Sequence, residues 1–168
     1  MKFKETLDIY FEKLKVYSEE QFIQKPDENS WSIGQVYVHA ILANDHFFLK
    51  QAERCLNKED THKGKGRNNR GRVVFLINGF PNMRFKMPKS AAVTPRQPES
   101  IDSIRQKLKR SLELAQLVER RLDGFDRNEK TRHPAFGHLN AKEWYRMSEM
   151  HFRHHLRQIR RIEKNLES

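Results

Sequence analysis

Three histidines in the sequence have the spacing of a metal site. His151 and His155 are four positions apart near the C-terminus, so in a helix they project from one face, about 40° apart around the axis. His39 falls on the core-facing stripe of another predicted helix. Neutral imidazoles bind divalent cations such as Zn, Ni, Cu or Fe, and two of them one turn apart can share an ion. On spacing alone, the three histidines could hold one cation, or they could be buried residues satisfied by hydrogen bonds.

Other histidines and three carboxylates could also take part in the site. His154 lies about 60° from His151 around the helix, which makes it a rival ligand or an outer partner of the site. His46 shares the predicted face of His39 but lies two turns further along the axis, too far to bind the same ion. The remaining histidines fall in predicted loops and have no obvious partner: His62, His133 and His138. Three carboxylates could serve as a base or an outer-shell partner, and none is favoured over the others: Asp45, Glu143 and Glu149.

Three protein ligands would leave one coordination position of the ion open, which is typical of catalytic rather than structural zinc. A water bound there could lose a proton near neutral pH, or the sulfur of a substrate thiol could displace it. The pattern is therefore compatible with an enzyme that activates water or a thiolate.

Four long helices are predicted to position these residues. Apolar side chains recur at three- and four-residue intervals over residues of about 3–24, 32–57, 99–123 and 141–166. Gly124 ends the third of these helices. Asn140 caps the fourth, with Glu143 at its third helical position as the reciprocal partner. Four arginines of this last helix fall on the side opposite the histidines, as a charged solvent face: Arg146, Arg153, Arg157 and Arg160.

The second helix has the clearest start signal. Pro26 ends the first helix, because proline disfavours helical geometry in the residue before it. Ser32 and Gln35 then have the spacing of a capping box, and Trp31 and Val36 that of a hydrophobic staple. The helix that carries His39 is therefore predicted to begin at residue 32.

Residues 59–98 form a basic connection between the second and third helices. Residues 61–98 contain nine Lys or Arg and no Asp or Glu, so they supply +9 of the net charge of +11. A bundle whose second and third helices run parallel needs one long crossover of this kind. Within it, the apolar residues 73–77 could dock on the body as one short helix. We therefore predict one all-α domain over residues 1–168, a four-helix bundle with a long crossover between helices 2 and 3.

The basic crossover has three possible uses. Its cations could contact the phosphates of a nucleic acid, but no aromatic residues for base stacking alternate with them, so we do not favour nucleic acid as a partner. They could form a positively charged lip that attracts an anionic small molecule. They could also be a solvated connection, which is the use we expect. The cations concerned are Lys63, Lys65, Arg67, Arg70 and Arg72.

The composition points to the cytoplasm. No apolar run is long enough to span a membrane, and the N-terminal stretch has no signal-peptide core. The single cysteine, Cys55, excludes an internal disulfide framework and agrees with a reducing compartment.

Two stretches and the histidine cluster resemble the DinB/YfiT-like superfamily. The stretches are Trp31–His39 and His133–Trp144, and the cluster is His151-x-x-His154-His155-x-x-Gln158. The resemblance extends over all four predicted helices and leaves out only the basic crossover. It implies a four-helix bundle in which His39, His151 and His155 hold a divalent metal. It also implies a homodimer, and an activity that in different members is hydrolysis, isomerisation or transfer of a low-molecular-weight thiol such as bacillithiol.

We therefore expect a divalent-metal-dependent enzyme, a hydrolase or a thiol S-transferase, that acts on a small-molecule substrate. The ion would be Zn, Ni, Fe or Mn, and a low-molecular-weight thiol would be a possible second cofactor. The alternative is a non-enzymatic stress-response binding module whose basic crossover engages an acidic partner or nucleic acid. Beyond the three histidines, the sequence identifies no catalytic or substrate-binding residue.

Overall fold

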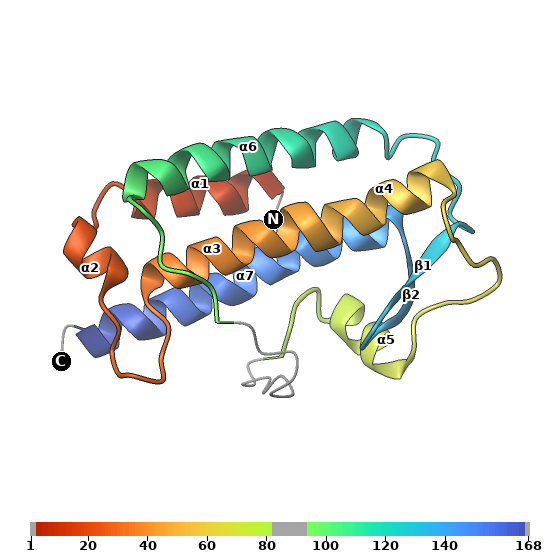
Figure 1. Cartoon of the computed structure of the whole chain (residues 1–168). Helices are drawn as coiled ribbons and strands as arrows, with labels where there is room; N and C mark the ends of the chain where they lie inside the picture. The colour runs from red at the N-terminus through yellow and green to blue at the C-terminus, as the bar shows by residue number, and fades with distance from the viewer. Residues whose placement is uncertain (1–2, 82–93, 167–168) are drawn as a thin grey trace.

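The computed structural model describes residues 3–81 and 94–166, and most of them form a bundle of long helices (Figure 1). In chain order the elements are α1 (Phe3–Lys13), α2 (Glu19–Ile23), α3 (Ile33–Ala43), η1 (Asn44–Phe48), α4 (Leu49–Asn57), α5 (Asn69–Leu76), α6 (Ile101–Arg120), β1 (Lys130–His133), β2 (Gly137–Asn140) and α7 (Ala141–Leu166). The predicted four-helix bundle is confirmed, with α1, the continuous α3–η1–α4 segment, α6 and α7 as its members. No helix in the described ranges is both long and apolar enough to cross a membrane.

Three hydrogen bonds give the relative direction of the α3–α4 segment and α6. Ser32 bonds to Gln97, Asn44 to Ser111 and Asn57 to Arg121. Residue numbers rise together in these three pairs, so the α3–α4 segment and α6 run parallel, as in Figure 1. The connection between them must therefore return along the length of the bundle, as the long crossover was predicted to do.

The first predicted helix is interrupted. It was expected to run to residue 24, but α1 ends at Lys13 and α2 begins at Glu19. Ser18 and Gln21 form a complete capping box at the start of α2. A serine side chain that caps a new helix favours a break in the preceding helix. This capping box was not predicted from the sequence.

The helix that carries His39 contains one turn of π-helix, η1, which was not predicted. The buried face of α3 runs through Tyr37, Ala40 and Ile41, whereas Leu42 is 48% exposed. His46, expected on the same face as His39, is exposed as well. His39 therefore lies half-buried at the edge of the core-facing stripe rather than at its centre.

A short β-hairpin precedes the last helix, where a linker was expected. β1 and β2 pair antiparallel, with Thr131 opposite Leu139, and both of these side chains are buried. The helical bundle is confirmed, and this short hairpin is a minor addition to the expected helices. The predicted start of α7 is confirmed, because the Asn140 main-chain N–H donates to Glu143 Oε2 (2.9 Å) and the Glu143 N–H to Asn140 Oδ1 (3.0 Å).

The basic crossover is folded over residues 61–80. Arg67 forms a bridge with Gly137 beside β2, and Asn68 caps α5, which begins four residues before the predicted short helix over 73–77. This part of the crossover is therefore folded against the hairpin, while four of its five cationic side chains are exposed: Lys63, Lys65, Arg70 and Arg72. The rest of the predicted crossover includes residues 82–93, which lie outside the described ranges.

Candidate metal centre

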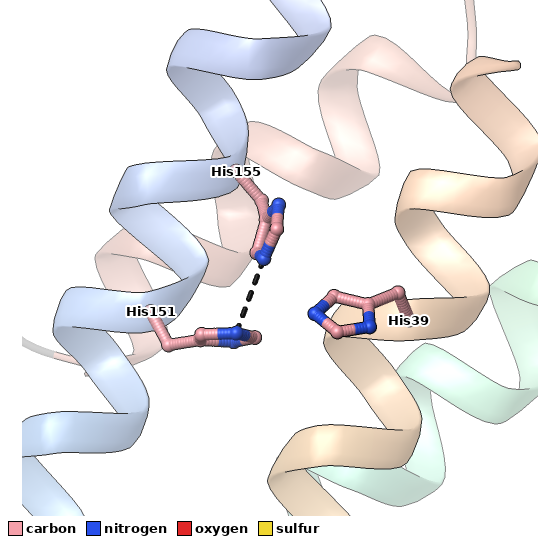
Figure 2. Close-up of side chains that lie close together, drawn as sticks. All are labelled: His39, His151 and His155. Atoms are coloured by element: carbon pink, nitrogen blue, oxygen red, sulfur yellow. Dashed lines mark hydrogen bonds between the residues drawn. The ribbon is translucent and has the colours of Figure 1, made fainter. Parts of the chain in front are cut away.

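One imidazole from α3 and two from α7 converge in the bundle. One ligand nitrogen from each of His39, His151 and His155 lies within 4.8 Å of the others. The ring centroids are 5.2 Å apart for His39 and His151, 4.7 Å for His39 and His155, and 4.4 Å for His151 and His155. In Figure 2 the His39 ring from α3 faces the pair from α7 across the gap between the two helices. The structure thus brings together the three histidines selected from the sequence.

His155 is held in one orientation by a neighbour on its own helix. Its Nδ1 lies 2.8 Å from Gln158 Oε1, and because an amide oxygen can only accept, this imidazole nitrogen carries the proton. The lone pair of a neutral ring is then on Nε2, which is directed at His151. The residue is 6% exposed. Gln158 therefore presents His155 to the site in the tautomer that a metal requires.

The contact between the two α7 imidazoles fits a shared cation. His155 Nε2 lies 3.1 Å from His151 Nε2, and two lone pairs at this separation repel unless a proton or a cation lies between them. His151 Nδ1 is buried and has no hydrogen-bond partner within the described residues. The ring therefore has only Nε2 for a polar interaction, and Nε2 points at the place where the other two rings converge (Figure 2).

The environment keeps these imidazoles neutral, which is the form that binds a metal. Burial lowers the pKa of His39 and, together with the other imidazoles, lowers that of His151 well below its ordinary value. Burial is also the main reason that the pKa of His155 falls to about 3, with His39 and His154 contributing. At neutral pH, no proton has to be removed from an imidazolium before a cation enters.

The walls of the site are aromatic. The Trp31 ring lies 5.1 Å from that of His39, and the Phe48 and Phe80 rings lie 5.0 Å and 6.4 Å from that of His151, measured between centroids. Such walls limit the access of water and strengthen electrostatic interactions inside the site.

His154 is not part of the converging group. Its Nδ1 lies 3.3 Å from an Arg157 guanidinium nitrogen, and burial, with Arg157 and Arg161, lowers its pKa to about 4. His154 is thus an outer neighbour of His155 rather than a rival ligand, and the centroids of the two rings are 5.1 Å apart.

The other histidines lie elsewhere. His46 is exposed on η1, and His62 and His138 contact each other at 5.2 Å near the hairpin. His133 packs against Phe136 and Trp144.

The three carboxylates suggested by the sequence are occupied by other partners. Each accepts hydrogen bonds away from the imidazoles: Asp45 from Ser111, Glu143 from the main chain of Asn140, and Glu149 from Thr6 and Arg153. The ligand group found within the described residues consists of imidazoles alone. The arrangement can hold a cation, but it places none of these carboxylates as a base beside it.

A chain segment that the sequence did not single out closes one side of the site. Guanidinium groups of α7 donate to residues that follow α5: Arg146 to Asn78 Oδ1 (3.1 Å), Arg153 to Asn78 O (2.8 Å) and Arg157 to Phe80 O (2.8 Å). The predicted solvent face of α7 is therefore wrong in part, because Arg153 and Arg157 are half-buried under this segment. The spacing of these arginines on one face of the helix was a signal for this contact. Such a face can bind the main chain of another segment as readily as it can face solvent.

Comparisons with known proteins agree with this architecture. The family model of the DinB superfamily matches residues 2–159. A crystal structure titled as that of TT2238, a four-helix bundle protein, is similar with a TM-score of 0.58 at 17% identity, over 94% of this chain and 92% of that one. At this identity the likeness shows the fold alone. The search of curated proteins found no match.

Proposed function

The chain belongs to the DinB superfamily, and on that premise we propose that it is a divalent-metal-dependent enzyme with His39, His151 and His155 as metal ligands. The observation that carries the proposal is the convergence of three neutral imidazoles, one held by Gln158, with ligand nitrogens within 4.8 Å of one another. Imidazole nitrogen suits Zn, Ni and Fe, and we include Mn as a candidate ion.

The residues of the chain have separable tasks in this proposal. The three imidazoles hold the ion, Gln158 fixes the tautomer of His155, and Trp31, Phe48 and Phe80 line the site. A divalent cation in such a site supplies Lewis-acid chemistry, which lowers the pKa of a bound water or thiol.

The ordinary pKa values of the two groups and the occupied carboxylates favour a thiol over water as the activated group. A free thiol has a pKa of about 8.5, whereas bulk water has a pKa of about 15.7, so a thiol needs much less help to ionise. Asp45, Glu143 and Glu149 are all engaged elsewhere. We therefore place S-transfer from a low-molecular-weight thiol ahead of hydrolysis as the proposed reaction.

The first test is the metal content of protein purified without an affinity tag. We expect about one transition-metal ion per chain by mass spectrometry, and its loss in His39→Ala and His151→Ala with the helical circular dichroism retained. His46→Ala is the matched control, because His46 is exposed on the same helical segment and should leave the metal content unchanged. Equal metal content in all three variants would show that His39 and His151 are not metal ligands.

The second test separates an enzyme from a metal that only ties α3 to α7. Metal-loaded protein would be assayed for conjugation of a thiol to an electrophile and for hydrolysis of activated esters, with His151→Ala as the blank. Turnover of the thiol that requires the metal supports the transferase, and turnover of the esters supports the hydrolase. If chelation lowered the melting temperature while neither substrate class reacted, the metal would be structural.

A further inference from the structure

A second group of charged side chains lies at the N-terminal end of α7, where the crossover meets the β-hairpin. It lines a pocket of about 220 Å³ formed by Gly66, Arg67, Arg72, Lys130, His138 and Glu143. Glu143 precedes His151 by eight positions, or about 12 Å along a helix axis. This pocket is therefore separate from the three imidazoles.

The frame of the pocket is fixed by main-chain hydrogen bonds. The His138 N–H donates to Gly66 O (3.0 Å), and the Asn68 N–H to Phe136 O (3.1 Å), so the crossover is bridged to the start of β2 at Arg67 and Gly137. Lys130 Nζ donates to Lys65 O (2.7 Å), which ties β1 to the same stretch. The cationic side chains thus extend from a backbone that is held in place before any ligand arrives.

The positive charge in the pocket exceeds the negative charge. Glu143 is the one carboxylate in the lining, and its Oε1 is paired with Arg67 Nε at 3.1 Å. Across the described ranges, neither Arg72 nor Lys130 forms an ion pair with a carboxylate. Two cations therefore face one pocket without a counter-ion from the chain.

The environment of His138 supports a positive potential. Burial lowers the pKa of this imidazole, and the charged neighbours that lower it further are all cationic or imidazole groups: His62, Lys65, Arg132 and Lys130. A neutral His138 can still donate one N–H to an anion.

The size and lining of the pocket restrict the class of ligand. Drug-sized molecules occupy pockets of about 300–1,000 Å³, so about 220 Å³ suits a single anionic group and little more. The lining has no aromatic side chain besides His138 on which a base could stack, and nearby Phe75 is covered by the guanidinium groups of Arg67 and Arg146. These features favour a small molecule over a nucleic acid.

We propose that this pocket binds the phosphate or carboxylate group of a small metabolite, with Arg72 and Lys130 as the charged donors and His138 as a neutral one. Charge-assisted hydrogen bonds of this kind are about twice as strong as neutral ones, and a guanidinium can bind two anionic oxygens at once. The site does not depend on the proposed metal chemistry and would remain if that proposal failed.

The test is a titration of the full-length protein with inorganic phosphate, and separately with acetate, at constant ionic strength. Binding is followed by the amide NMR signals of Gly66, Gly137 and His138. We expect saturable shifts at these amides, weakened at least about tenfold by the double substitution R72Q/K130Q, which removes two charge-assisted contacts. The two ligands distinguish a phosphate site from a carboxylate site.

The matched control is R70Q/R127Q, which removes the same net charge from two exposed cations that lie near Arg72 and Lys130 in the sequence but do not line the pocket. Its affinity for phosphate should stay within about twofold of the parent. An equal loss in both double variants would show a diffuse positive surface and overturn the proposal, as would the absence of saturable shifts. So would a short single-stranded RNA that bound more tightly than phosphate and lost affinity equally in both variants. The His39→Ala protein should bind phosphate normally, so failure here and failure of the metal site are distinguishable.

Discussion

Single residues decide how the two imidazoles of α7 face each other. His155 has a polar partner for each ring nitrogen, Gln158 for Nδ1 and His151 for Nε2. His151 has a partner for one nitrogen and none for the other within the described residues. The His151 ring is therefore oriented by packing, mainly against Phe48, whereas His155 is oriented by a hydrogen bond. The two ligands should respond differently to substitution of their neighbours.

Replacing Gln158 tests the hydrogen-bonded ligand. Gln158→Leu removes the acceptor for His155 Nδ1–H, and loss of an outer partner of this kind lowers metal affinity about 10- to 100-fold. Competition with a chromophoric chelator would measure the change. Arg160→Gln is the control, because Arg160 is exposed on the same helix. An unchanged affinity in Gln158→Leu would show that the amide does not orient the ligand.

The stability of the metal-free protein should fall as the pH drops below about 6.5. The pKa of His155 is about 3 in the folded chain, against an ordinary value of 6.5, so the unfolded chain binds more protons between these values. The free energy of unfolding therefore decreases with falling pH, by up to about 1.4 kcal/mol per pH unit for each such histidine. Urea unfolding between pH 7 and 5 would measure the slope. His155→Gln should reduce it, and a stability that rose toward pH 5 would contradict the prediction.

At the scale of elements, the sequence predicted what apolar periodicity and helix caps encode and missed what depends on contacts between distant segments. Apolar periodicity predicted α6 and α7, and the Asn140–Glu143 pair predicted where α7 begins. The π-helical turn η1 has no such pattern. It accompanies buried polar contacts, in which Asn44 donates to Ser111 (2.7 Å) and accepts from Ser148, residues that are distant in sequence and meet only after the bundle forms.

The hairpin escaped prediction for a related reason. Each strand has four residues, too few for alternation to stand out. The crossover pairs with the hairpin through the bridge between Arg67 and Gly137. Such pairing between distant segments cannot be read from local sequence. The candidate site was predicted only with the help of the family resemblance. The helix shared by two of the histidines and the capping box before the third still left open that all three are buried residues satisfied by hydrogen bonds.

Gly137 is where this pairing can be tested. Its φ is +87°, and a Cβ there would lie 2.5 Å from the main-chain nitrogen of Asn68 and 2.7 Å from Gly66 O. We expect Gly137→Ala to destabilise the protein by about 3 kcal/mol, through backbone strain and displacement of the crossover, as measured by urea unfolding.

Gly64→Ala separates the two causes. Gly64 also has a positive φ, of +74°, but nothing within 4 Å of its ideal Cβ. Strain alone should cost about 1–2 kcal/mol there. Equal losses at the two glycines would mean that the close approach of the crossover to β2 contributes nothing.

At the scale of the whole molecule, α5 and the residue that follows it expose three large apolar side chains. Val73, Leu76 and Ile77 are 50%, 84% and 53% exposed. Three such residues at helical spacing are an unusual group for a surface that faces only water. We propose that they contribute to the homodimer expected from the family resemblance.

Light scattering after size exclusion would test the dimer. The expected mass is twice the 20.2 kDa of the chain, and Leu76→Lys should shift it toward the monomer. Leu117→Lys is the control, because Leu117 is 54% exposed on a different helix, α6. A monomeric parent protein at tens of micromolar would rule out the assembly.

Both ends of the crossover are fastened to the bundle close to the histidines. Before it leaves the described residues, Phe80 is held by Arg157; after it returns, Gln35 donates to Pro95 O (2.6 Å) and Gln97 donates to Ile23 O (3.0 Å). Because the two ends are held by separate contacts, a substitution that releases one end should leave the other attached to the bundle.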